Sequence, residues 1–421
     1  MTSAGPTAGP TTKGLRLDAP TPLGELAGRR LTDDVFSLPL LTLDDAALAH
    51  NIAVAARVCA ERGVEHWPHV KTHMSPELWA RQEAAGAAGA TVATPVQLRT
   101  VHAWGVRRAL LANELLDERD AAWLRSALEG DGGLEEAWLE VDSPRGVEVL
   151  ARAFDGASPD VVARLGVLVE LGAAGARTGL RSLEEVRGLA RAVHDAGLRL
   201  LGVVGYEGAV AGTTDAPGRA AVAAWCGQVR AAAEALVADG LVAGVPVLSA
   251  GGSAFVDVVL DELPRPSADG SVPRVVVRSG AYVSHDHGHY ERADPWSRIA
   301  GAEPLRAAIT VWGQVLSVPE PGLALLGVGR RDVSFDIDLP TPMWLRPASD
   351  DNLGAALPLT GARVTALNDQ HAFVSLDAGT TLVPGDIVGL GISHPCTTFD
   401  KWRVAAVTRG DDVVDLYTFD F

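Results

Sequence analysis

One stretch of the chain runs Leu200-Leu201-Gly202-Val203-Val204-Gly205-Tyr206 and is apolar throughout instead of alternating. A stretch of helical periodicity follows at 216–238, and a second apolar run comes at 246–250. Strands that are apolar on both sides are typical of parallel sheets, because helices cover both faces of such sheets. The stretch therefore predicts a strand, a crossover helix and a parallel strand.

The same alternation extends in both directions from this unit, with helical stretches such as 182–196 between the apolar runs. The eight predicted strands lie at 64–71, 90–94, 109–113, 137–142, 166–171, 200–206, 246–250 and 274–279. Repeated strand–helix units in this number predict an α/β fold, a closed (β/α)8 barrel of the TIM type.

After Gly301 the pattern changes to runs of Val, Leu and Thr that are broken by Pro, Gly and Asp. Such runs predict the strands of an antiparallel sheet or barrel; they lie at 308–318, 323–335, 362–376, 386–392, 403–407 and 413–419. The first twenty residues lack apolar periodicity and predict disorder. We expect a partly disordered leader at 1–36, the barrel at 37–300 and a β-domain at 301–421.

Composition disfavours several classes of partner. The net charge of −17 repels nucleic acid and anionic lipid, and no apolar run is long enough to span a bilayer. The N-terminus lacks the order of a signal peptide, so we expect a cytoplasmic protein. Three cysteines are too few and too scattered for a disulfide framework.

Lysine is scarce, since arginine replaces it almost everywhere and only Lys13, Lys71 and Lys401 remain. A guanidinium cannot replace an amine that must lose its proton. Lys71 ends the first predicted strand, in the segment Trp67-Pro68-His69-Val70-Lys71-Thr72-His73. Burial there would lower its pKa and favour Schiff-base chemistry, although a lysine that pairs with a neighbouring acid explains the position equally well.

Glycine-rich segments follow the seventh and eighth predicted strands. They are Ser249-Ala250-Gly251-Gly252-Ser253 and Arg278-Ser279-Gly280-Ala281-Tyr282. Barrels often bind phosphate at these two loops, because glycine lets backbone N–H groups approach an anion. Either loop alone is usually just a turn, but together they predict a phosphorylated ligand.

Two side chains at other strand ends are candidates for contact with that ligand. Arg177 follows the fifth strand and is either a ligand contact or a solvated cation. Tyr206 ends the sixth strand and either donates to a cofactor or belongs to the core.

His394-Pro395-Cys396 is a candidate metal site in the β-domain, because nitrogen and sulfur ligands suit zinc. Two ligands require an open site that water, substrate or distant residues complete, and a partly buried cysteine near a chance histidine is the alternative. A weaker candidate is His285-Asp286-His287-Gly288-His289, which we expect to be a solvated turn between the domains. His371 is a further candidate that could approach the site from the β-domain.

The segment Pro68-His69-Val70-Lys71-Thr72-His73 resembles the cofactor-lysine motif of the D-serine dehydratase and D-threonine aldolase family. This family has the alanine-racemase-like barrel of fold-type III pyridoxal phosphate (PLP) enzymes. The resemblance runs from about residue 38 to 402 and includes Arg-Thr-Gly, Gly-Gly-Ser and His-Pro-Cys segments in the same order. Met74 departs from the pattern, because relatives often have a second lysine after the histidine.

The resemblance implies that Lys71 holds PLP covalently and that Arg177 contacts the ring nitrogen. It implies a phosphate cradle made of Gly251, Gly252, Ser253, Gly280 and Ala281, and a divalent metal held by His394 and Cys396. Cysteine at the second metal position is similar to the dehydratase branch and favours zinc. Relatives of this fold also imply a homodimer.

Together with this resemblance, the residues predict a PLP- and metal-dependent lyase that removes water and ammonia from a D-β-hydroxy amino acid and leaves a 2-oxo acid, with zinc or another divalent metal. We expect catalytic roles for Lys71, Tyr206 and Arg177, and a small amino acid as substrate. Three alternatives stay open at this point: a D-threonine-type aldolase that gives glycine and an aldehyde, a PLP carrier without turnover, and a metal-only hydrolase that uses His285, His287 and His289.

Overall fold

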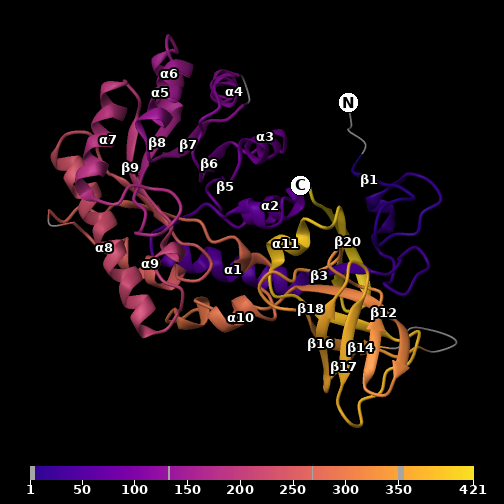
Figure 1. The fold of residues 1–421 in the computed structure, drawn as a ribbon. Coiled ribbons are helices and arrows are strands. Elements are labelled where there is room, and N and C mark those ends of the chain that lie inside the picture. Colours follow the sequence, from indigo (N-terminus) through magenta and orange to yellow (C-terminus); the bar gives the residue numbers. More distant parts are fainter. Residues whose placement is uncertain (1–4, 131–132, 268, 349–354) are drawn as a thin grey trace.

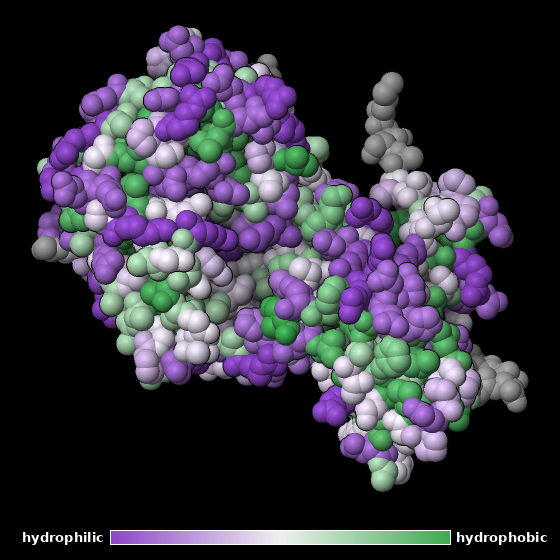
Figure 2. All heavy atoms as spheres, in the orientation of Figure 1, coloured by the Kyte–Doolittle hydropathy of each residue, from purple (hydrophilic) through white to green (hydrophobic). Residues whose placement is uncertain are grey.

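The computed structural model describes residues 5–130, 133–267, 269–348 and 355–421, and it has two parts (Figure 1). One part is a parallel sheet surrounded by helices, and the other is an antiparallel β-domain. Figure 2 shows the two parts as distinct lobes, with polar side chains covering much of the barrel lobe on this face. No helix in the described ranges is long and apolar enough to cross a bilayer.

The parallel sheet has eight strands in the order β4-β11-β10-β9-β8-β7-β6-β5. A parallel bridge between His69 and Thr91 joins its two edges, and Thr91 N donates to Pro68 O at 2.9 Å. The predicted α/β barrel with a C-terminal β-domain is confirmed. The strands are β4 (Glu65–His66), β5 (Ala90–Val92), β6 (Arg108–Leu111), β7 (Glu136–Val141), β8 (Leu165–Glu170), β9 (Leu200–Val204), β10 (Val247–Ala250) and β11 (Arg274–Val277).

Helices α1 to α10 connect and cover these strands. Several begin with a Ser or Thr side chain that accepts the backbone N–H three residues later, followed directly by proline, as at Ser75, Thr94, Ser143 and Ser158. This combination satisfies a free donor and fixes the backbone for the first turn. The helices are α1 (Asp45–Glu61), α2 (Pro76–Ala84), α3 (Pro95–Ala103), α4 (Glu118–Glu129), α5 (Pro144–Ala153), α6 (Pro159–Arg164), α7 (Leu183–Asp195), α8 (Ala216–Ala238), α9 (Val256–Glu262) and α10 (His289–Ala293).

A compact apolar plug fills the barrel interior. Trp67 and Trp138 stack there with ring centroids 4.2 Å apart, together with side chains from β6, β8, β9, β10 and β11. Gly166 makes room for this stack, because a Cβ at that position would lie 2.5 Å from Trp138 Cδ1. The barrel is therefore a packed core, and groups that carry chemistry must lie above it, at the carboxyl ends of the strands.

The β-domain includes a strand that the sequence did not predict, β3 (Leu40–Asp44). It pairs antiparallel with β12 and parallel with β19, so residues before the first helix belong to this sheet. The other strands are β12 (Ile309–Glu320), β13 (Leu323–Leu326), β14 (Thr341–Arg346), β15 (Leu357–Pro358), β16 (Ala362–Leu367), β17 (Ala372–Leu376), β18 (Ile387–Gly391), β19 (Val404–Arg409) and β20 (Asp412–Thr418).

Two predicted strands of this domain differ from the structure. The predicted strand 362–376 is a hairpin, in which β16 and β17 pair antiparallel. The predicted strand 323–335 ends at Leu326, because Asp332 accepts the N–H of Gly329 and closes a turn.

Residues 5–36 pack on the β-domain, although the sequence predicts disorder for the first twenty residues and a partly disordered leader up to residue 36. Residues 1–4 lie outside the described ranges. Strands β1 (Thr7–Ala8) and β2 (Thr21–Pro22) pair antiparallel. Leu15, Leu23, Leu26 and Phe36 are buried in a cluster that includes Trp312. Apolar residues at irregular spacing have packed against a distant sheet, which local periodicity cannot reveal.

Candidate active site

A cavity of ≈ 400 Å³ lies at the carboxyl ends of the barrel strands. Barrel loops form most of its wall, and residues 393–396 and Ile337 of the β-domain form the remainder. Lys71, Arg177, Tyr206, His394 and Cys396 all line it, so the structure brings these five predicted residues together. The volume is in the ordinary range for a small-molecule or cofactor site.

Lys71 enters the cavity from a short 3-10 helix, η2 (Val70–Thr72), which begins four residues after the end of β4. Burial lowers the pKa of its amine; Cys396 opposes this shift, whereas Arg177 and Arg278 add to it. The other two lysines lie elsewhere, Lys13 beside Asp332 and Lys401 over the Phe335 ring. Lys71 is therefore the lysine suited to react with an aldehyde cofactor in this cavity.

A buried ion pair forms another part of the cavity wall. Arg278 Nη1 lies 2.5 Å from Glu140 Oε1, and both side chains are less than a tenth exposed. Arg278 also donates to the carbonyl oxygen of Gly205, so the guanidinium is fixed from two sides. The sequence analysis quoted Arg278 only as part of a loop and missed Glu140, although an acid inside an apolar strand run was a usable signal.

Arg177 and Tyr206 contact each other at the rim. The guanidinium carbon of Arg177 lies 4.9 Å from the centroid of the Tyr206 ring, within cation–π range. Burial raises the pKa of the Tyr206 hydroxyl, which is therefore a proton donor at neutral pH. Both side chains lie against the cavity, as a direct contact with a ligand requires.

The predicted phosphate cradle lies only partly at the cavity. Gly252, Ser253, Gly280 and Ala281 line it, whereas Ser249 and Gly251 do not. The N–H groups of Gly251 and Gly252 donate to the carboxylate of Glu207, a residue that the sequence analysis missed as a functional candidate.

Gly280 has a packing reason to be glycine, because a Cβ there would lie 2.4 Å from His69 O. Its small size lets the segment that carries Lys71 approach the loop after β11. The glycine-rich segments, from which a phosphate site was predicted, therefore also allow close contacts between loops.

His394 and Cys396 reach the cavity from the start of α11 (Pro395–Phe399). Cys396 Sγ donates to Thr72 Oγ1 at 3.5 Å, which places the thiol beside the neighbour of Lys71. Asp336 Oδ2 lies 2.6 Å from His394 Nδ1, and Asp336 Oδ1 accepts from Thr397 Oγ1. A hydrogen bond with Cys396 is the main reason that the pKa of His394 is raised, to about 9.

The expectation that residues 285–289 form a solvated turn is wrong for His285 and Asp286, whereas His289 is exposed. His285 and Asp286 are only 1% and 2% exposed, and the Asp286 carboxylate accepts the N–H groups of Gly288 and Tyr290. Asp286 and His289 line the cavity. Within the described ranges, however, the three imidazoles do not converge into a metal-binding group. His371 is exposed in the turn between β16 and β17, away from the cavity lining.

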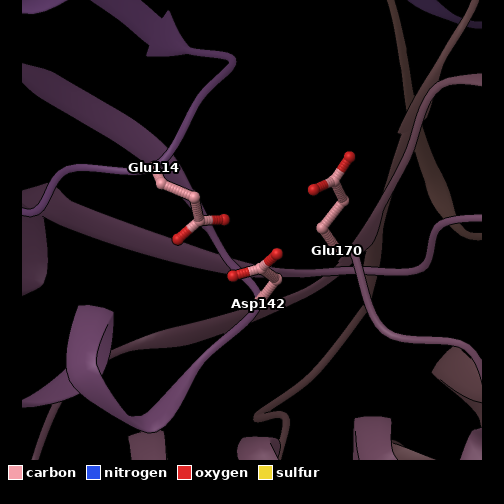
Figure 3. A group of neighbouring side chains, drawn as sticks. All are labelled: Glu114, Asp142 and Glu170. Carbon is pink, nitrogen blue, oxygen red and sulfur yellow. The ribbon is translucent and has the colours of Figure 1, made fainter. Parts of the chain in front are cut away.

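Three carboxyl groups converge beside the cavity, and the sequence analysis missed them (Figure 3). Glu114 lies three residues after the end of β6, Asp142 directly follows β7, and Glu170 ends β8, so all three lie at the carboxyl ends of strands. Burial, followed by the charge of Asp142, raises the pKa of Glu114 to about 8. Burial and Glu140 raise the pKa of Glu170 to about 7. Glu114 therefore holds a proton at neutral pH, chiefly because burial disfavours the charged form of its carboxyl group.

Comparisons with known proteins agree with this architecture. Residues 43–258 match the family model "Alanine racemase, N-terminal domain", and residues 308–408 match "Putative serine dehydratase domain". A D-threonine aldolase from Arthrobacter sp. is 24% identical over 408 residues, 96% of each chain. A D-threo-3-hydroxyaspartate dehydratase from Delftia sp. is 32% identical over 260 residues, 59% of this chain and 63% of the relative.

The crystal structure of a D-threonine aldolase from Filomicrobium marinum superposes with a TM-score of 0.75 at 23% identity, covering 93% of this chain and 98% of that one. These matches confirm the resemblance that was stated from the lysine motif.

Proposed function

Because the chain belongs to the alanine racemase N-terminal domain family and carries a serine dehydratase-type domain after it, we propose that it is a PLP- and metal-dependent lyase. The reaction eliminates water from a D-β-hydroxy amino acid, and hydrolysis of the resulting enamine, through its imine tautomer, takes up water again and releases ammonia and a 2-oxo acid. One observation carries the proposal: Lys71 and the His394–Cys396 pair face a single cavity, and Thr72 links them.

The cavity has the groups that PLP requires. Lys71 supplies a buried amine of lowered pKa, and Ser253, Gly280 and Ala281 form the part of the wall suited to a phosphate. Arg177 is our candidate for the contact to the ring nitrogen, with Tyr206 as the neighbouring hydroxyl donor. The carboxyl ends of the strands, where barrel enzymes bind their substrates, form this wall.

The donor set at the β-domain wall suits a divalent metal. His394 and Cys396 offer one nitrogen and one sulfur, the ligands that zinc prefers. Asp336 occupies His394 Nδ1, which leaves Nε2 for a metal, an arrangement common among metal-binding histidines. Two protein ligands leave open positions for water or substrate, as a catalytic metal needs.

When bound, PLP supplies an electron sink for the Cα–H bond, and the metal supplies a Lewis acid for the β-hydroxyl. Lys71 Nζ would be the group that takes the Cα proton, and burial, which lowers the pKa of this amine, favours its uncharged form. The buried Arg278–Glu140 pair keeps a fixed cation at the wall without adding net charge. The packed barrel interior below the cavity excludes water from that side.

A D-threonine-type aldolase is the second candidate, and one observation favours it. The Arthrobacter aldolase aligns with 96% of this chain, whereas the Delftia dehydratase aligns with 59% at higher identity. The same site would cleave Cα–Cβ if a base took the β-hydroxyl proton. Cys396 at the second metal position leads us to favour dehydration.

The test is product analysis after incubation of the enzyme with PLP, zinc and D-threonine. Dehydration gives 2-oxobutyrate and ammonia, whereas aldol cleavage gives acetaldehyde and glycine. We expect 2-oxobutyrate as the main product, and a predominance of acetaldehyde would establish the aldolase instead. The Lys71→Ala variant controls for reaction without the enzyme-bound cofactor.

We also propose that the protein is a cytoplasmic homodimer. The fold analogy supports the dimer. The cytoplasmic location is supported by its cysteines, because Cys59, Cys226 and Cys396 are all unpaired.

A further inference from the structure

Glu207 links two loops of the cavity from behind. It starts the short 3-10 helix η3 (Glu207–Ala209), directly after Tyr206, and its side chain is fully buried. Its two carboxylate oxygens accept the N–H groups of Gly251 at 3.0 Å and of Gly252 at 2.5 Å. The loop after β10 is thereby fixed to the loop after β9.

The glycines of this loop allow that close contact. Gly251 has a φ of +95°, which favours glycine. A Cβ on Gly252 would lie 2.6 Å from Tyr206 Cε2 and 3.1 Å from Glu207 Oε1. The loop is therefore pressed against residues 206–207, and its next two residues, Ser253 and Ala254, are turned to the cavity.

We propose that Glu207 is a positioning residue, which holds the loop after β10 in the conformation that presents Ser253 and Ala254 to the cofactor phosphate. Glu207 is not part of the cavity lining, so it acts through the loop without touching a ligand. This inference rests on the proposed function, because it requires a cofactor that carries phosphate.

The Glu207 carboxylate restricts the conformation of the loop, which its two glycines alone would leave flexible. Two glycines in succession have high conformational freedom, and ordering them has an entropic cost. A buried acceptor that binds both N–H groups selects one conformation, because a buried N–H group without a partner is costly. Substituting Glu207 should therefore make the loop that carries Ser253 and Ala254 more mobile. The segment that carries Lys71 should stay unchanged.

The experiment compares Glu207→Gln with the unchanged protein. Apo forms are titrated with PLP and, separately, with pyridoxal, which has the same aldehyde ring without the phosphate. We expect the dissociation constant for PLP to rise about tenfold and that for pyridoxal to change less than twofold. A general loss of folding would move both constants together.

Asp386→Asn is the matched control. Asp386 is also a buried carboxylate that accepts two backbone N–H groups, those of Ala348 and Val383, but it lies in the β-domain away from the cavity. This variant should leave both dissociation constants unchanged. If Glu207→Gln does not fold, Glu207→Asp offers the same comparison, because its shorter side chain cannot span both N–H groups.

Equal weakening of PLP and pyridoxal binding, or no change in either, would overturn the role of Glu207. Failure of the proposed function looks different, since the unchanged protein would then bind neither compound at Lys71.

Discussion

The two walls of the cavity hold their functional groups in different ways. On the barrel wall, Arg278 and Glu140 are less than a tenth exposed and belong to one packed sheet, Glu140 on β7 and Arg278 directly after β11. On the β-domain wall, the side chains of His394 and Asp336 are 29% and 43% exposed and lie on a short helix and a loop. The barrel wall is therefore preformed and buried, and the β-domain wall is open to solvent.

This difference predicts separate roles for the two walls, one that binds the cofactor and one that binds the metal. A buried, rigid wall suits a cofactor that stays bound through turnover, and an exposed pair of ligands suits a metal that exchanges with solvent. Variants on the β-domain wall should change metal binding and rate without releasing the cofactor.

The largest expected effect is that of Cys396→Ala. Loss of the thiolate leaves His394 as the single ligand from this segment, and we expect loss of bound zinc and a fall in kcat of at least about 100-fold. Metal content and rate on D-threonine are the measurements, with the absorbance of the cofactor band unchanged. Cys59→Ala, at a buried thiol away from the cavity, is the control. Retention of zinc by Cys396→Ala would contradict the claim that the β-domain wall binds the metal through Cys396.

A smaller effect is expected for Asp336→Asn. The amide has no negative charge and can donate to His394 Nδ1, which disfavours the tautomer that leaves Nε2 free for metal. We expect zinc affinity, measured by chelator competition, to weaken about 10- to 100-fold.

Asp338→Asn is the control for this variant, because Asp338 pairs with Arg292 near the same loop. Unchanged zinc affinity in Asp336→Asn would show that the carboxylate does not orient the imidazole.

The smallest effect concerns stability on the barrel side. The folded state raises the pKa of Glu114 from 4.5 to about 8, so between these pH values it binds a proton that the unfolded chain lacks. Stability from this group is present at low pH and is lost as pH rises through about 8. Glu114→Gln should therefore become more stable relative to the unchanged protein, by about 1–2 kcal/mol, between pH 5 and pH 8.5.

Urea unfolding at both pH values measures this difference. The control is Glu118→Gln, at an exposed position on α4. Its free energy of unfolding should differ from that of the unchanged protein by the same amount at both pH values. A stability difference for Glu114→Gln that is also the same at both pH values would show that the folded state does not raise the pKa of Glu114.

The sequence predicted what depends on local pattern. The helix predicted at 216–238 matches α8 (Ala216–Ala238), and the eight apolar runs correspond to the eight parallel strands. Lys71 stood out because the chain has so few lysines, and His394 and Cys396 because two ligand types are two residues apart.

What the sequence did not predict depends on contacts between distant residues. Arg278 and Glu140 are 138 positions apart, and Glu207 is 44 positions before Gly251. Strand β3 is defined by its pairing with β12 and β19, and the N-terminal segment by its packing around Trp312. Hydrophobic periodicity within one segment cannot predict such contacts, because only the folded chain brings these residues together.

The most direct test of the account is reduction of the PLP-loaded enzyme with borohydride, followed by peptide mapping. Only Lys13, Lys71 and Lys401 offer side-chain amines, so the three outcomes are easily separated. The account predicts that the reduced cofactor is attached to the peptide that contains Lys71. A label on Lys13 or Lys401, or no label at all, would contradict it.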